Sequence, residues 1–105
     1  MRVLKLTLSK KPFEVMVTGE KTKEYRRPSK WILSRLINKE YDVVEFTNGY
    51  GKDKPRFTCE YRGYLISASE RSITFSNGLA LDVKSGDVVI LLGKVISVEN
   101  YNQHL

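Results

Sequence analysis

Hydrophobic residues occupy every second position near the start of the chain. Residues 3–8 read Val-Leu-Lys-Leu-Thr-Leu, and because side chains alternate between the two faces of a strand, this segment is predicted to be a half-buried strand. Residues 10–18 change to the three- and four-residue spacing of a short helix, which Ser9 can cap and Gly19 can end. The apolar face of this helix is expected to hold Phe13, Met16 and Val17.

A second strand and a second helix are predicted next. Residues 22–27 form the strand, with Glu24 and Arg26 on one face, and Pro28 ends it. Ser29 suits the N-cap of a helix over residues 31–38. The side chains grouped on the apolar face of that helix are Ile32, Leu33, Leu36 and Ile37, and Trp31 is expected to stack on Arg35, four residues further on.

Two longer strands are predicted on either side of a polar loop. Residues 41–47 form the first and end at Asn48-Gly49, a dipeptide typical of turns. The loop at residues 50–55 is the most polar part of the chain, and such loops either contact a ligand or have no role. Residues 57–65 form the second strand. Its alternation places Leu65 on the face of Tyr61 and Tyr64 on the other face, with Gly63 as a candidate bulge.

The last third of the chain is predicted to contain only strands. Residues 73–75 and 79–83 are expected to pair as a hairpin. The apolar run at 88–92 predicts a strand covered on both faces, which residues 94–98 either extend or pair with. Five to seven mostly antiparallel strands and two short helices indicate one α+β domain over residues 1–105, folded as a small, partly closed β-barrel.

The positive charge of the chain is concentrated in its first sixty residues. The whole chain carries a formal charge of +6, but residues 1–62 carry +7 and residues 63–105 carry −1. A basic surface attracts polyanions, so RNA, another nucleic acid or a phosphate-bearing nucleotide becomes a reasonable partner. The alternative is that the charge only keeps the protein in solution.

Several classes of protein are disfavoured by what the chain lacks. Cys59 has no second cysteine to pair with, lies in phase with the apolar face of its strand and is expected in the core of a cytoplasmic protein. His104 is the only histidine and is next to last, which argues against Ser-His-Asp and Cys-His catalysis and against a metal site. No run approaches the ~20 apolar residues of a membrane span, no secretory signal is seen, and no cofactor is expected.

The most informative segment is residues 19–26, which read Gly-Glu-Lys-Thr-Lys-Glu-Tyr-Arg. A glycine turn brings Lys21 to the head of a strand that carries Glu24 and Arg26 on one face. Such a group could recognise a polar ring, since the carboxylate accepts hydrogen bonds and the two cations donate them. The structural alternative is a surface ion pair that contributes about 0–1 kcal/mol.

These residues match all four fixed positions of the Gly-x-Lys-x-x-Glu-x-Arg motif of the ASCH domain. The chain also resembles short bacterial and phage ASCH proteins in the helix at 31–36, the strand at 41–46 and the closing segment at 86–96, whereas residues 64–84 match poorly. The resemblance implies a PUA-like β-barrel. It also implies a cleft between barrel and helices that binds RNA or a possibly modified nucleotide.

On that basis the ligand-binding residues are expected to be Lys21, Glu24 and Arg26, with Gly19 forming the turn. A second group comprises Asn48, which could bond to a base, and Tyr50 and Trp31, which could stack on one. Each has a structural alternative: a turn residue for Asn48, a solvated loop residue for Tyr50 and a packing aromatic for Trp31.

Some relatives of this type are enzymes, so a hydrolase is the alternative hypothesis. One branch removes the acetyl group of N4-acetylcytidine with a lysine, a threonine and a glutamate. Lys21 matches the lysine, but Glu24 replaces the threonine, and the glutamate has only Glu60 or Glu70 as candidates. Other relatives cleave RNA, yet this chain lacks internal histidines, so Lys21 and Glu24 would have to substitute as catalytic residues. A third hypothesis is a phage-borne interaction protein.

Overall fold

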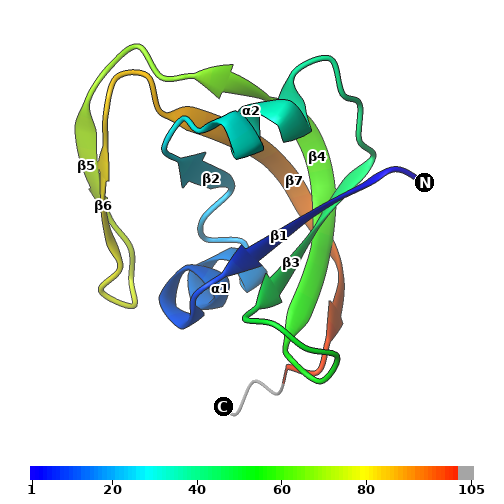
Figure 1. Cartoon of the computed structure of the whole chain (residues 1–105). Helices are drawn as coiled ribbons and strands as arrows, with labels where there is room; N and C mark the ends of the chain where they lie inside the picture. Colours follow the sequence, from blue (N-terminus) through cyan, green and yellow to red (C-terminus); the bar gives the residue numbers. More distant parts are fainter. Residues whose placement is uncertain (102–105) are drawn as a thin grey trace.

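The computed structural model describes residues 1–101 of the chain. Within that range it has seven strands and two helices in an α+β arrangement (Figure 1). Five strands curl into a half-barrel, which confirms the expected class of small β-barrel with two short helices. The elements are β1 (Val3–Leu8), α1 (Lys10–Val17), β2 (Lys23–Arg26), α2 (Lys30–Leu36), β3 (Val43–Asn48), β4 (Arg56–Ile66), β5 (Arg71–Thr74), β6 (Ala80–Val83) and β7 (Val88–Glu99).

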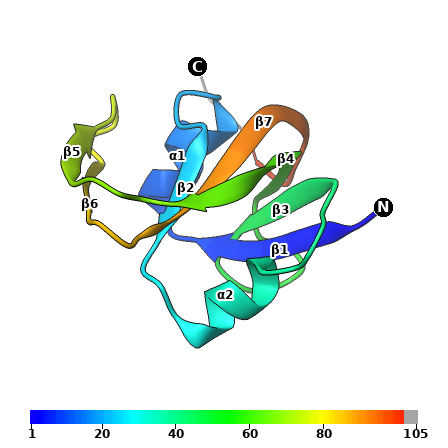
Figure 2. The ribbon, with the colours of Figure 1, turned by 90° about the horizontal axis from the view of Figure 1, so that it is seen from above.

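The half-barrel sheet has the strand order β1-β3-β4-β7-β2. β1 runs parallel to β3, and the other neighbours are antiparallel. The parallel pair is possible because α1, β2 and α2 lie between these two strands in the chain and supply the long crossover that parallel strands need. The helices α1 and α2 lie at opposite ends of the curled sheet (Figures 1 and 2).

The core lies between the concave side of the sheet and the two helices. Leucines at alternate positions of β1 are buried, as the sequence pattern predicts. Phe57 of β4 is the centre of an aromatic cluster, with its ring centroid 5.1 Å from that of Phe13 on α1 and 5.2 Å from that of Phe46 on β3. These contacts join α1 to the middle of the sheet.

The helix boundaries differ slightly from the sequence prediction. Ser29 caps α2, since its side chain accepts a hydrogen bond from the Ile32 N–H at 3.1 Å, whereas Ser9 makes no side-chain cap for α1. Ile37 was expected on the buried face of α2, but its backbone is extended and its side chain is half-exposed. The helix ends at Leu36 because residue 37 has left helical geometry.

β4 contains an irregularity that changes which side chains face the core. The predicted alternation assigned Leu65 to the face of Tyr61, but the register shifts between Tyr61 and Tyr64, which pair with Leu92 and Ile90 of β7. Because Leu92 and Ile90 are two residues apart, their partners share one face. The inserted residue at Gly63, which has a positive φ of 97°, therefore moves Tyr64 onto the core side and exposes Leu65.

β5 and β6 pair as the predicted hairpin and form a second sheet that stands beside the half-barrel (Figures 1 and 2). β7 is a single strand, so residues 94–98 extend it past Gly93. Only its first part is fully buried, from Val88 to Ile90. Among residues 1–101, neither helix has the length and apolar run needed to cross a bilayer. His104 lies outside the described residues.

Candidate functional site

The loop between α1 and β2 carries the predicted motif. Gly19 has a φ of 87°, in the left-handed region that glycine adopts without strain. Its N–H donates to the Met16 carbonyl, and the Lys21 N–H donates to the Val15 carbonyl at 2.9 Å. This turn reverses the chain directly after the helix and sends the Lys21 side chain back under the loop.

Lys21 and Glu24 form a buried ion pair. Only 3% of Lys21 and 6% of Glu24 is exposed. The Lys21 ammonium lies 2.9 Å from the Glu24 carboxylate, donates to the Lys23 carbonyl and to the Met16 sulfur, and sits 5.5 Å from the centroid of the Tyr25 ring. Glu24 is directed inward because its register partner on β7, Ile90, is a core residue.

Arg26 completes the network and joins the two edges of the half-barrel. Its Nε donates to the second Glu24 oxygen at 2.9 Å, and its terminal nitrogen donates to the Thr7 carbonyl at 2.8 Å. Thr7 lies on β1 and Arg26 on β2, the two edge strands of the sheet. The structure thus brings Lys21, Glu24 and Arg26 together, but as one buried polar network instead of a surface ion pair.

This network limits the chemistry that the motif can perform. The Lys21 ammonium has three acceptors around it, and both Glu24 oxygens already accept charge-assisted hydrogen bonds. A general base needs a free lone pair within reach of its substrate. Lys21 and Glu24 therefore hold the loop and the strand in place, with the Lys21 ammonium directed at three protein acceptors and each Glu24 oxygen bonded to a cation.

Asn48, Tyr50 and Trp31 take no part in this network. No hydrogen bond or ion pair within residues 1–101 joins them to Lys21, Glu24 or Arg26. Tyr50 is 83% exposed on its loop, and Trp31 is 49% exposed on α2, where Arg35 stacks on it at 5.3 Å as expected.

The two glutamates considered for a hydrolase have other partners or are exposed. Glu60 accepts hydrogen bonds from the Lys94 N–H and from Arg62, and these bonds lower the pKa of its carboxyl group. Glu70 is exposed between β4 and β5. No hydrogen bond or ion pair in the described part of the chain connects either carboxylate with the Lys21 ammonium.

Cys59 is a buried core residue, and its chemistry follows from that burial. Desolvation, assisted by the nearby Glu60 charge, raises the pKa of its thiol from 9.0 to about 12. We expect the folded protein to react with a thiol reagent far more slowly than the unfolded chain, since the thiolate is the reactive form. Reaction rates with and without denaturant test this, and equal rates would contradict it.

The raised pKa of the Cys59 thiol also predicts that the stability of the protein depends on pH. Between pH 9 and about 12 the unfolded chain loses the Cys59 proton while the folded chain keeps it, so the free energy of unfolding falls as the pH rises through this range. Burial also raises the pKa of Tyr61, which acts in the same direction. Thermal unfolding of the wild type and of Cys59→Ala over this range measures the part due to the thiol.

A groove lies between β2 and the β5–β6 hairpin. It consists of two adjoining hollows of about 210 and 180 Å³ that share Lys23, Tyr25 and Arg71. The Arg71 guanidinium donates to the Tyr25 hydroxyl at 3.2 Å across the groove. Phe75 lines the hollow that also contains Lys21.

Hydrogen bonds at both ends hold the hairpin over this groove. At the tip, Ser76 donates its N–H and its hydroxyl to the Glu20 carboxylate, which lowers the pKa of Glu20. At the base, the Ser67 N–H donates to the Asp87 carbonyl at 2.8 Å, and the Gly86 N–H donates to the Ser67 carbonyl at 2.7 Å. We define the hairpin groove as the hollows lined by Lys23, Tyr25, Arg71 and Phe75.

A further pocket of about 520 Å³ lies on the other side of the motif loop. Lys21 and Thr22 line both this pocket and the hairpin groove, so the loop separates the two. Its opposite wall is formed by the start of β4 and the middle of β7, where Lys94 is exposed. Within residues 1–101, no three Asp, Glu, His or Cys residues converge as a metal site would require.

Lys23, Tyr25 and Arg71, which line the hairpin groove, are not among the residues predicted from the sequence. Lys23 and Tyr25 occupy variable positions of the motif, on the strand face opposite Glu24. Arg71 lies within residues 64–84, the segment that matches the short ASCH proteins poorly. The alternation of side chains in β2 could have indicated two of them, because it places Lys23 and Tyr25 together on the face opposite Glu24.

Comparisons with protein-family models, curated proteins and solved structures find no match to this chain.

Proposed function

We propose that this protein is a nucleic-acid-binding module that holds single-stranded RNA or a possibly modified nucleotide in the hairpin groove. The observation that carries the proposal is the combination of cations and aromatic rings in one concave surface. Lys23 and Arg71 are exposed there, and Tyr25 and Phe75 lie beside them. Grooves that bind single strands combine positive charge for phosphates with rings for base stacking.

The charge balance of the groove supports an anionic ligand. The acidic side chain that lines it, Glu20, is already bonded to Ser76. Lys23 and Arg71 have no carboxylate within ion-pair distance in residues 1–101. Their charges are therefore available to phosphate groups, and Lys23 is one of the cations behind the +7 charge of residues 1–62.

The buried network contributes to binding by positioning the groove. Glu24 is held by Lys21 and Arg26, so the strand that carries Lys23 and Tyr25 on its outer face is fixed to both the loop and β1. The hydrolase hypothesis has no comparable support, because the Lys21 ammonium is fully engaged by its neighbours.

Removing both groove cations should weaken RNA binding. For Lys23→Ala with Arg71→Ala, we expect the affinity for a short single-stranded RNA at low salt to fall roughly ten-fold, because two phosphate contacts are lost. The slope of log affinity against log salt should fall by about 0.7 for each contact removed. Fluorescence anisotropy of a labelled RNA at several salt concentrations measures both quantities.

Lys52→Ala is the matched control, since it removes one exposed lysine from the polar loop after β3. It should leave the affinity nearly unchanged. The proposal fails if the double variant binds RNA like the wild type, or if Lys52→Ala weakens binding as much as Lys23→Ala or Arg71→Ala made singly. The second result would indicate diffuse attraction to the whole basic surface.

A further inference from the structure

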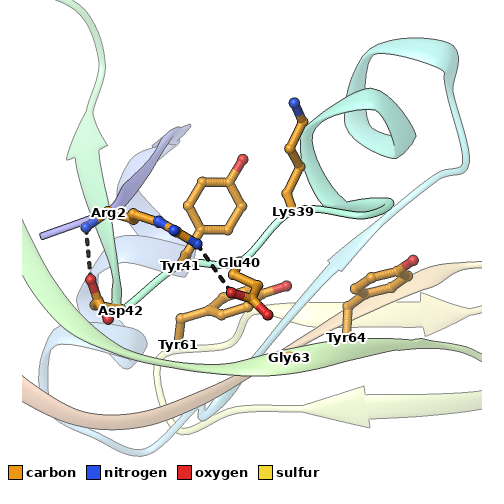
Figure 3. A pocket seen from close by; sticks show the side chains of 8 residues that line it. All are labelled: Arg2, Lys39, Glu40, Tyr41, Asp42, Tyr61, Gly63 and Tyr64. Atoms are coloured by element: carbon orange, nitrogen blue, oxygen red, sulfur yellow. Dashed lines mark hydrogen bonds and ion pairs between the residues drawn. The ribbon is translucent and has the colours of Figure 1, made fainter.

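A pocket of about 790 Å³ lies between the connection from α2 to β3 and the strand β4 (Figure 3). Three tyrosines line it, Tyr41 on the connection and Tyr61 and Tyr64 on β4. None of the residues that define the hairpin groove contributes to it. The proposed function does not use this pocket, so its lining needs a separate explanation.

The bulge in β4 creates the pocket floor. Tyr61 and Tyr64 would face opposite sides of a regular strand, but the register shift brings both to the core side. Gly63 lies between them without a side chain, and nothing within 4 Å surrounds the position of its missing Cβ. Figure 3 shows the two rings rising from the same strand on either side of this glycine.

Tyr41 forms a rigid wall above the floor. Its ring meets the Tyr61 ring edge-on, with centroids 5.4 Å apart, and its hydroxyl donates to the Arg35 carbonyl. The hydroxyls of Tyr61 and Tyr64 make no hydrogen bond to another group in residues 1–101. The pocket therefore offers a fixed aromatic surface and two hydroxyls that are free to bond.

Charged side chains form the rim of the pocket. The Arg2 guanidinium bonds to the exposed Glu40 carboxylate at 3.1 Å, and the Arg2 backbone N–H donates to the Asp42 carboxylate at 2.7 Å. Lys39 is exposed and has no ion-pair partner in the described chain, and Figure 3 shows its ammonium above the pocket.

We propose that this pocket binds one unpaired nucleobase that carries a phosphate group. The base stacks on the tyrosine rings and bonds to the free hydroxyls, and the phosphate lies near Lys39. Flat neutral rings suit such a surface, and proteins commonly recognise RNA by stacking single splayed-out bases on aromatic side chains. The ligand is either a free nucleoside monophosphate or one base of a single strand.

The test follows the tyrosine ring resonances by NMR during titration with nucleoside monophosphates, with nucleosides and with a short single-stranded RNA. We expect the Tyr61 and Tyr64 resonances to shift on saturation. Tyr64→Ala should weaken binding about five-fold or more, while Tyr64→Phe keeps most of the affinity because stacking remains. If the monophosphate saturates the pocket, the ligand is a free nucleotide; if only RNA shifts the rings, the ligand is a base within a strand.

Two controls keep the result interpretable if Tyr64→Ala perturbs packing. Lys39→Ala changes an exposed side chain and should weaken binding of the phosphorylated ligand but not of the nucleoside. Tyr50→Ala, at an 83% exposed ring, should change nothing. The proposal is overturned if no ligand shifts the Tyr61 and Tyr64 resonances, or if Tyr50→Ala weakens binding as much as Tyr64→Ala.

The pocket and the hairpin groove can be tested independently. The double variant at Lys23 and Arg71 should keep the response of the Tyr61 and Tyr64 resonances to the mononucleotide. If that variant abolishes it, the pocket is not a separate site. If RNA affinity survives in the double variant while the tyrosine response remains, the groove proposal fails and the pocket proposal stands.

Discussion

Glu24→Gln is expected to lower the free energy of unfolding by about 3 kcal/mol, because it leaves a buried lysine without its counter-charge. Lys21 is 97% buried and is held by Glu24 at 2.9 Å. The amide of glutamine has nearly the shape of the carboxylate, so packing is retained while the charge is lost. The new amide also fails to replace both acceptors, since one carboxylate oxygen bonds Lys21 and the other bonds Arg26.

Chemical denaturation with urea measures this change. Glu45→Gln is the matched control, because Glu45 lies on β3 of the same sheet, is only half-buried and has no ion-pair partner in residues 1–101. Its effect should stay within about 0.5 kcal/mol. A loss of stability no larger for Glu24→Gln than for Glu45→Gln would show that the buried network is not important for the fold.

The stability of Glu24→Gln also affects how binding experiments on variants of Lys21 and Arg26 are interpreted. If Glu24→Gln destabilises the protein, a loss of RNA binding in Lys21→Ala or Arg26→Ala can arise from a displaced β2 strand. Variants at Lys23 and Arg71 avoid this difficulty, because both side chains are exposed and outside the network. They therefore report more directly on contact with a ligand.

Phe57→Ala is expected to lower the free energy of unfolding by about 3–5 kcal/mol, through loss of buried apolar surface and formation of a cavity. The Phe57 side chain is 1% exposed and packs against both Phe13 and Phe46. Its removal separates α1 from the centre of the sheet. Phe57 also lines the 520 Å³ pocket, so the cavity would enlarge that pocket instead of closing.

Denaturant unfolding of Phe57→Ala and of Tyr50→Ala tests this prediction with one matched pair of aromatic truncations. Tyr50 is exposed on its loop, so its removal should cost less than about 0.5 kcal/mol. Equal effects of the two variants would contradict a core centred on Phe57.

Most of the secondary structure follows from local patterns in the sequence. The alternating leucines of β1 and the capping serine of α2 act over a few residues, so their consequences are visible without tertiary information. The prediction failed at Ile37 and at Tyr64. In the first case the helix ended one residue before the apolar pattern did, and in the second a bulge reversed the side-chain alternation.

The sequence also identified Lys21, Glu24 and Arg26 as a group, because their spacing places them near one another on a turn and a short strand. It did not show whether they face solvent or the core. That depends on the pairing of Glu24 with Ile90 of β7, more than sixty residues further along the chain. The same long-range pairing places the outer face of β2 beside Arg71 of the hairpin.

By itself, the sequence determined the order of strands and helices, the small α+β class and the position of the charged motif, because these depend on local periodicity and residue type. The tertiary structure alone decided that the motif forms a buried network joining two sheet edges. It also decided that the exposed cations and rings gather in a hairpin groove and a tyrosine pocket. The groove and the pocket both depend on strand register, and the pocket also depends on the bulge at Gly63, where a shift of a single residue exchanges the buried face for the exposed one.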